Sequence, residues 1–158
     1  MLTVPCRHGR YLTVVRPDAF HLWPYYFRRS AARPRLSLRG DALSQMLAHL
    51  NVHAGARGLV VDDAFGIPTL ALLERLGGHG RLVHIYELSE PSIDALQVAN
   101  LTSDLRAPLR ILPATRIQAE MFTPPPVTDN DAKRIDRRER LLEQITTQKE
   151  LQQGGFDL

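Results

Sequence analysis

Three short apolar runs alternate with helix-length segments between Asp41 and Leu112, and this alternation limits the fold more than any other feature. The runs are GLVV at 58–61, RLVHIY at 81–86 and LRIL at 109–112. Short runs of this kind suit the strands of a parallel sheet, whose faces are covered by helices. Strands that alternate with helices favour an α/β fold with right-handed crossovers. We predict a partial Rossmann-like parallel sheet of about three strands, with the first run at its buried centre.

The segment before the first run has a helical pattern. Leu43, Met46, Leu47 and Leu50 follow the i, i+3, i+4, i+7 spacing of one helix face. Asp41 precedes them and is a predicted N-cap.

Prolines and glycines mark the ends of two further helices. Pro68 suits the first position of a helix that is apolar on most sides, and Gly77-Gly78 ends this helix as a glycine C-cap. Pro91 opens a third helix that runs to about Leu101.

The α/β pattern does not extend over the whole chain. We predict an aromatic and basic lead-in at 1–35, with a strand at 11–15, and an incomplete α/β domain at 36–122. A proline-rich linker follows at 123–131, and a charged helix and tail complete the chain at 132–158.

Cysteine content and hydropathy indicate the compartment. Cys6 is the single cysteine, so no internal disulfide forms and a reducing environment is expected. No apolar run approaches the roughly 18 residues of a membrane span, and the N-terminus lacks the apolar core of a signal peptide. These features favour the nucleus or cytosol, and we expect a nuclear location. The net charge of +3 permits a nucleic-acid partner without requiring one.

The stretch LVVDDAFGIP at 59–68 resembles the start of a nucleotide-cofactor site. Asp62, Asp63 and Gly66 follow the first predicted strand, and Glu87 follows the second. An acidic residue about 20 residues beyond the glycine loop commonly binds ribose hydroxyls, and Glu87 fits this separation.

The glycine pattern of this loop does not fit a cofactor site. A cofactor loop needs several glycines for its tight turn and for close approach of the backbone to the ligand. Here Phe65 and Ile67 flank Gly66, and their side chains would fill that space. A strand-to-helix turn with a capping acid and a packed phenylalanine explains the stretch better than a working cofactor site does.

A run of arginines between 28 and 39 suggests a second kind of site. No acid interrupts this run, and Trp23, Tyr25, Tyr26 and Phe27 precede it. Arginines with neighbouring aromatics suit a phosphate backbone with stacked bases. The alternative, of equal weight, is that the arginines are solvated and the aromatics pack in the core or against a partner. The arginines are Arg28, Arg29, Arg33, Arg35 and Arg39.

Other catalytic and metal-binding patterns are missing from the sequence. His49 and His53 lack the glutamate of a zinc-protease motif and are better explained as surface histidines. Cys6 and His8 are too few for a structural metal site. We therefore expect no metal site and no catalytic residue.

Several of these motifs occur together in one known family. LRGDALSQML, LVVDD and LLERLGGHGR resemble the non-catalytic subunit of the eukaryotic tRNA (adenine-N1)-methyltransferase, which modifies a T-loop adenine. The resemblance is strongest over 36–87. It extends loosely upstream through VVRPD and YYFRR, and the final QQGGFDL is also similar. Residues after Leu101 match poorly, and the chain has fewer strands than the family's sheet, as in a fragment or a shortened form.

The resemblance implies a methyltransferase-type fold whose S-adenosylmethionine loop, at Asp62, Asp63, Gly66 and Glu87, is vestigial. It implies no cofactor on this chain, because the partner, a paralogous catalytic subunit, uses S-adenosylmethionine. The complex would hold two copies of each subunit and bind tRNA. Two alternatives remain: a methyltransferase in its own right, and a protein-interaction module without RNA binding.

Overall fold

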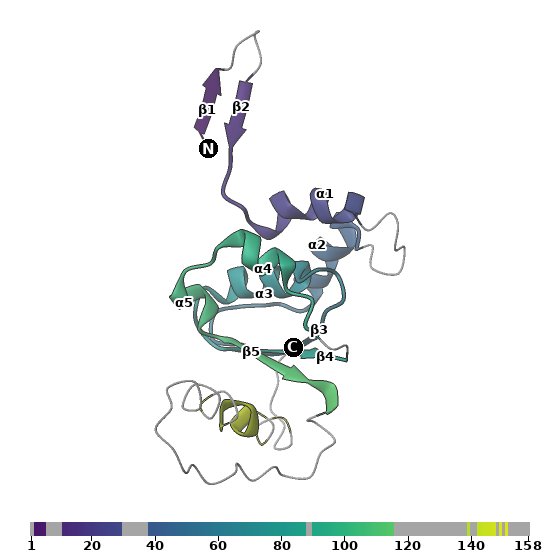
Figure 1. Ribbon diagram of the computed structural model, residues 1–158, viewed down its shortest axis with the longest axis vertical. Helices are drawn as coiled ribbons and strands as arrows, with labels where there is room; N and C mark the ends of the chain where they lie inside the picture. The colour runs from purple at the N-terminus through teal and green to yellow at the C-terminus, as the bar shows by residue number, and fades with distance from the viewer. Residues whose placement is uncertain are drawn as a thin grey trace.

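The computed structural model describes residues 2–5, 11–29, 38–87 and 90–115, together with residues 139, 142–147, 149 and 151. These residues form an antiparallel two-stranded hairpin, β1-β2, and a parallel three-stranded sheet with the order β3-β4-β5 (Figure 1). The predicted α/β fold with about three parallel strands is confirmed. The predicted linker at 123–131 lies outside the described residues.

The parallel sheet consists of β3 (Arg57–Val61), β4 (Arg81–Tyr86) and β5 (Leu109–Pro113). The residue pairs Leu59–Val83 and Val83–Arg110 set the register of the sheet. Paired residues in neighbouring strands lie on the same face, so Leu59, Val83 and Arg110 share one face of the sheet. All three predicted strands are present.

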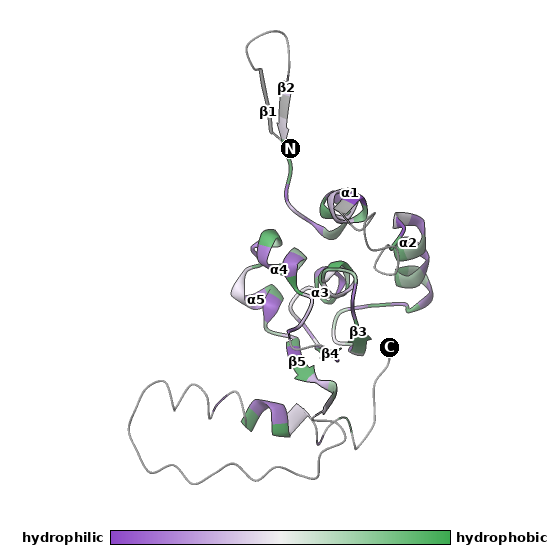
Figure 2. Cartoon of the chain, turned by 45° about the vertical axis from the view of Figure 1, so that its right-hand side comes forward, coloured by the Kyte–Doolittle hydropathy of each residue, from purple (hydrophilic) through white to green (hydrophobic). Residues whose placement is uncertain are grey.

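Helices cover the opposite face of this sheet. α3 (Ile67–Leu76) connects β3 to β4, whereas α4 (Asp94–Ala99) and α5 (Ser103–Arg106) lie between β4 and β5. The strands are added in one direction, so two right-handed crossovers place their helices on the same face. Figures 1 and 2 show α1 to α5 on one side of the strands.

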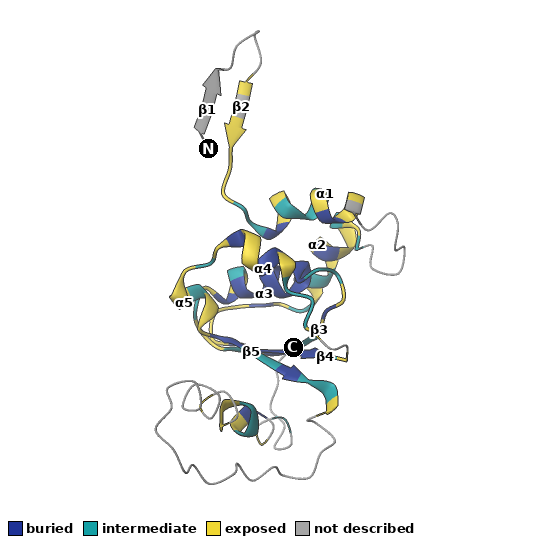
Figure 3. Ribbon diagram, viewed as in Figure 1, coloured by how far each residue is buried: buried dark blue, intermediate teal, exposed yellow. Residues whose placement is uncertain are grey.

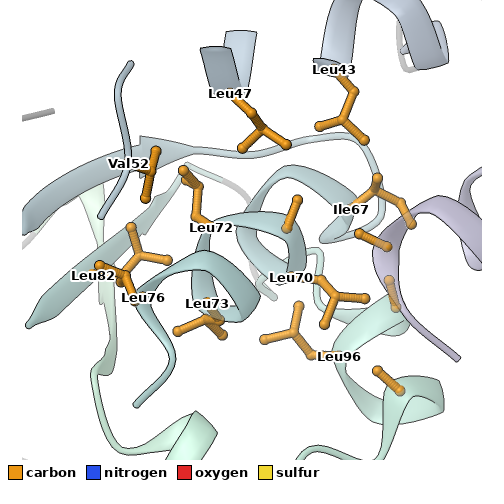
Figure 4. Close-up of a cluster of buried hydrophobic side chains, with 14 of the residues drawn as sticks. Leu43, Leu47, Val52, Ile67, Leu70, Leu72, Leu73, Leu76, Leu82 and Leu96 are labelled. Atoms are coloured by element: carbon orange, nitrogen blue, oxygen red, sulfur yellow. The ribbon is translucent and has the colours of Figure 1, made fainter. Parts of the chain in front are cut away.

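The main core forms between α3, the sheet and α2 (Gly40–His49). α3 is buried along most of its length, as predicted. It begins next to Pro68 and ends at Gly77, which adopts φ 60° as the predicted C-cap. Figure 4 shows how the leucines interlock. The fully buried leucines of this core are Leu43, Leu47, Leu70, Leu73, Leu76 and Leu82.

A second, smaller cluster lies on the other face of the sheet. Val83, Ile85 and Leu112 are buried there, with Leu151 packed against them. Leu151 belongs to the C-terminal helical segment, which we define as residues 139, 142–147, 149 and 151. The charged helix predicted from 132 onward is helical at these residues, and its other residues lie outside the described part.

The helix α1 (Ala19–Arg29) lies within the lead-in predicted at 1–35, where no helix was expected. Pro24 lies inside this helix and masks its pattern in the sequence. Ala19, Leu22, Trp23 and Tyr26 nevertheless follow the i, i+3, i+4, i+7 spacing of a buried face, and all of them belong to the main core or pack against it.

The hairpin stands apart from this body. It pairs β1 (Leu2–Pro5) with β2 (Tyr11–Val14). The predicted strand at 11–15 is thus confirmed, and its partner β1 was not foreseen. Figures 1 and 3 show the hairpin projecting away from the helices. Tyr11 is 72% exposed and Val14 is 60% exposed.

Two local expectations were wrong. β3 is an edge strand among the described residues, with Leu59 39% and Val61 61% exposed, whereas β4 occupies the centre. The apolar run alone does not reveal how many neighbours a strand has. Asp41 lies within the first turn of α2, and the N-cap is Arg39.

Candidate functional site

The loop after β3 is organised around a buried carboxylate. Asp62 is 2% exposed. Its Oδ1 accepts a hydrogen bond from the Ala64 backbone N–H at 2.8 Å. Its Oδ2 accepts from the Thr69 backbone N–H at 3.0 Å and from the Thr69 hydroxyl at 2.7 Å. The carboxylate thus satisfies backbone donors near the start of α3, as the capping-acid interpretation predicts.

The backbone turns sharply at the glycine of this loop. Phe65 adopts φ 59° and Gly66 adopts φ 80°. A Cβ placed on Gly66 would lie 2.7 Å from Leu96 Cδ1 and 3.0 Å from the Ser92 carbonyl oxygen. The Ala95 N–H donates to the Phe65 carbonyl at 2.9 Å. The start of α4 therefore packs directly on the glycine.

The Phe65 side chain is packed against α1. Its ring stacks on Tyr26, with ring centroids 5.3 Å apart and an interplanar angle of 29°. The cavity between this ring, Trp23 and Leu38 measures about 10 Å³, which is about the space that one water molecule needs. This is the packed phenylalanine expected for a turn without a cofactor.

The other acids predicted at this site have different surroundings. Asp63 follows Asp62 and is exposed, and Glu87 is exposed immediately after β4. Gly66 is buried. The predicted positions therefore lie at the carboxyl ends of β3 and β4, as the fold requires. Asp62 is buried, however, whereas the other two acids are exposed to solvent.

A histidine that no sequence motif indicated lies beside this loop. His84 in β4 has no exposed surface, and its Nδ1 lies 3.0 Å from the Thr69 hydroxyl. The hydroxyl hydrogen bonds to Asp62, so the hydroxyl oxygen accepts from His84 Nδ1–H. His84 Nε2 is buried without a hydrogen-bond partner among the described residues. A polar residue inside the apolar run RLVHIY was the available signal.

Burial is the largest influence on His84. Desolvation lowers the pKa of the His84 imidazole below its usual value, while the carboxylates of Asp62 and Asp63 oppose this shift. The neutral imidazole donates to the Thr69 hydroxyl, which in turn donates to Asp62. These two hydrogen bonds link the loop after β3 to α3 and β4. Their role is structural.

The arginine run is only partly described. Arg28 is exposed near the end of α1, and the backbone of Arg29 belongs to the same helix. Arg39 forms an ion pair with Asp41, with Nη2 and Oδ2 2.8 Å apart. An acid immediately beyond the run thus pairs with its last arginine. Arg33 and Arg35 lie outside the described residues.

The aromatic residues before this run have two roles. The Trp23 Nε1–H donates to the Leu38 carbonyl at 2.6 Å and so links α1 to the start of α2. Tyr26 is buried. By contrast, Phe20, Tyr25 and Phe27 are exposed. The alternative that the aromatics pack in the core is therefore confirmed for Tyr26, whereas stacking of bases on the exposed rings stays a prediction.

The described part of the chain offers neither a metal centre nor a membrane span. Within the described ranges, no group of three or more His, Cys, Asp or Glu side chains is arranged to hold a metal ion. Among the same residues, no helix has both the length and the apolar character needed to cross a membrane.

Comparison with known proteins gives a consistent result. Three relatives carry the name tRNA (adenine(58)-N(1))-methyltransferase non-catalytic subunit TRM6. The Debaryomyces hansenii protein is 27% identical over 97 residues, which cover 61% of this chain and 20% of that protein. The mouse protein is 31% identical over 75 residues, covering 48% of this chain and 15% of that protein. The Dictyostelium discoideum protein is 24% identical over 99 residues, covering 63% and 19%.

The matched region spans a fifth or less of the length of these relatives. The Gcd10p family, by contrast, matches residues 6–148, which is most of the chain. This match includes α1 to α5, the parallel sheet and the loop around Asp62. The chain therefore belongs to the Gcd10p family.

Proposed function

We propose that this chain is a non-catalytic, tRNA-binding and scaffolding subunit of a tRNA adenine-N1 methyltransferase complex. Family membership and the names of the relatives support the general role. The observation that carries the non-catalytic part is the packing on Gly66. Leu96 and the Ser92 carbonyl lie so close to this glycine that even a Cβ atom would have no room, and this supports a loop that is filled by the protein itself.

The hydrogen bonds of the same loop support this assignment. The N–H groups of Ala64 and Thr69 bond to Asp62, and the Ile67 N–H bonds to the Ala64 carbonyl at 3.1 Å. Backbone donors at the start of a helix are the groups that hold a ligand in a nucleotide-binding loop. Here they are used within the protein. We infer that the chain binds no cofactor and that the partner subunit uses S-adenosylmethionine.

The remaining parts of the proposal concern partners. The catalytic subunit would pair with this chain in a complex of two copies of each, located in the nucleus. tRNA would contact the exposed arginines of the run, of which Arg28 is described at the surface. Arg39 is the weakest candidate, because Asp41 already neutralises it.

The first experiment is co-expression with the catalytic subunit, followed by tRNA binding across a salt series. We expect co-elution and an affinity that falls steeply with salt, because phosphate contacts release counterions. Replacing Arg28, Arg29, Arg33 and Arg35 with alanine should flatten that dependence. Co-elution without any tRNA binding would instead support a protein-interaction module. The exposed apolar residues of β3 favour that alternative.

Calorimetry with S-adenosylmethionine tests the cofactor part separately. The isolated chain should give no heat and no thermal shift. Saturable binding that Glu87→Ala weakens would overturn the assignment and favour a methyltransferase in its own right.

A further inference from the structure

A cluster of basic side chains lies at the amino-terminal ends of the parallel strands, far along the chain from the predicted arginine run. Arg57 and Arg81 are directly paired in the register of β3 and β4. Arg110 pairs with Val83, two residues after Arg81, so its side chain starts from the same face of the sheet. Neighbouring strands lie about 4.8 Å apart, so these arginines form a row across the sheet.

The neighbouring arginines of the row influence the charge of Arg81. Desolvation lowers the pKa of Arg81, and the positive charges of Arg110 and Arg57 lower it further, while Glu143 opposes them. The positive charges of Arg57 and Arg110 therefore act on Arg81. Glu143, on the C-terminal helical segment, raises the pKa of Arg81 and forms an ion pair with Arg110.

A cavity of about 450 Å³ adjoins this row along β5. Its volume falls in the range of about 300–1,000 Å³ that is common for ligand sites. Apolar residues of β5 form part of its wall. Its polar lining consists of Tyr86, Arg106, Arg110, Glu143, Gln144 and Thr147.

Glu143 lines this cavity and places a negative charge beside Arg110. Its Oε1 lies 2.7 Å from Arg110 Nε, and the Glu143 side chain is half exposed. The Arg110 Nη1 group also donates to the carbonyls of Ala107 at 2.8 Å and Leu109 at 2.9 Å. A carboxylate on a guanidinium takes the position that a phosphate oxygen would take. Arg110 is thus held in place, and the anion seated on it belongs to the protein itself.

We propose that the row of Arg57, Arg81 and Arg110, together with Arg106 at the adjoining cavity, binds the phosphate backbone of RNA, and that Glu143 competes with the phosphate for Arg110. The proposal rests on the tRNA-binding role proposed above and assigns it a second surface. A row of cations spaced by sheet geometry suits the regular charges of a nucleic-acid strand. Tyr86 at the cavity wall offers an aromatic ring for an unstacked base.

The test uses the complex with the catalytic subunit and an unmodified tRNA transcript, measured by fluorescence anisotropy from low to high salt. The groove variant carries Arg57→Gln, Arg81→Gln and Arg106→Gln. Its matched control carries Arg16→Gln, Arg75→Gln and Lys149→Gln, which removes the same charge from exposed positions outside the row and the arginine run. We expect the groove variant to bind about 10-fold more weakly or worse, with the salt slope reduced by about 0.7–0.9 for each arginine–phosphate pair that is removed.

Glu143→Gln provides an independent test that does not depend on weakened binding. Removing the competing carboxylate should tighten tRNA binding severalfold. Glu139→Gln, one helical turn earlier on the same segment, changes the net charge equally and should have a smaller effect. Equal effects of the two glutamine variants would overturn the competition.

The outcomes separate this inference from the proposed function. If the groove variant binds tRNA no more weakly than the control variant does, the inference fails and the proposed function stands. If the groove variant keeps its tRNA affinity but no longer co-elutes with the catalytic subunit, the row is a protein interface and the inference fails. A wild-type complex that binds no tRNA would overturn both.

Discussion

Gly66 shows at the level of one residue how a tight strand-to-helix turn depends on a glycine. The position requires glycine because φ is 80° and because α4 packs on the Cα atom. In a cofactor site the same lack of a side chain admits the ligand. Here it admits Leu96. The glycine is needed in either case, and its neighbours decide what it accommodates.

Gly66→Ala should therefore destabilise the fold strongly. The left-handed backbone and the overlap with Leu96 together should lower the free energy of unfolding by about 2–4 kcal/mol. Gly77→Ala is the control, because Gly77 has φ 60° but a Cβ added there would meet no atom within 4 Å. It should cost only the backbone strain, about 1–2 kcal/mol. Urea unfolding of both variants measures the difference, and equal losses would contradict the packing argument.

His84 predicts a dependence of stability on pH. Its folded-state pKa lies below the unfolded value, which is about 6.5. The full stability is therefore present above the unfolded pKa, and it falls as the pH drops from there toward the folded pKa, because the unfolded chain takes up a proton that the native state excludes. The slope for one proton is at most about 1.4 kcal/mol per pH unit.

His84→Leu should flatten the unfolding free energy between about pH 6.5 and 5, whereas His49→Gln, at an exposed position, should leave the slope unchanged. Chemical denaturation at a series of pH values gives both slopes. A slope that survives in His84→Leu would assign the dependence to another group.

At the scale of elements, local sequence pattern was enough to predict some helices and strands, whereas others depend on tertiary context. The runs that became β3, β4 and β5 were recognisable from apolar composition, and α3 from its proline and glycine ends. α1 was not predicted, although its buried residues keep helical spacing, because a proline inside a segment ordinarily argues against a helix. The position of β3 at the edge depends on which strands surround it, and no local pattern encodes that.

The exposed edge strand β3 should promote self-association. Val61 is 61% exposed on β3, and Val98 is 53% exposed on α4. An edge strand with apolar side chains can pair with another chain, and a lysine there blocks the pairing. Val61→Lys should reduce concentration-dependent association, and Val98→Lys should reduce it less, as measured by light scattering. Equal effects would point to general apolar surface instead.

At the scale of the whole molecule, one compact body carries a projecting hairpin. The helices and the parallel sheet share the main core, whereas β1 and β2 pair with each other away from it (Figure 1). A two-stranded hairpin is marginally stable by itself. The stability of the molecule should therefore be unevenly distributed.

Amide hydrogen exchange tests this distribution. In the isolated chain, amides of β2 should show protection of about 1 kcal/mol or less, whereas those of β4 should exchange only with global unfolding. If β2 were protected as strongly as β4, the hairpin would be part of the cooperative unit.

The candidate site was predictable to a similar extent as the fold. The sequence placed Asp62, Gly66 and Glu87 at the ends of neighbouring strands, because parallel topology follows from the alternation of elements. It did not reveal the link from Asp62 through Thr69 to His84, since those residues meet only when α3 packs on the sheet. The row formed by Arg57, Arg81 and Arg110 was likewise hidden, because its members are far apart in the chain.

The hydrogen bond from Arg110 to the Leu109 carbonyl makes the two edges of the sheet differ in their capacity to pair with a further strand. The Pro108 carbonyl accepts a hydrogen bond from the Leu82 N–H on β4. The next carbonyl, that of Leu109, therefore faces away from β4, and it accepts a hydrogen bond from the Arg110 guanidinium. Among the described residues, a strand of another chain can therefore pair with the free edge of β3, whereas the Arg110 side chain obstructs such pairing at β5. Two copies joined through β3 would present an obstructed strand at either end, so such an assembly would terminate itself as a closed pair instead of growing into a fibre.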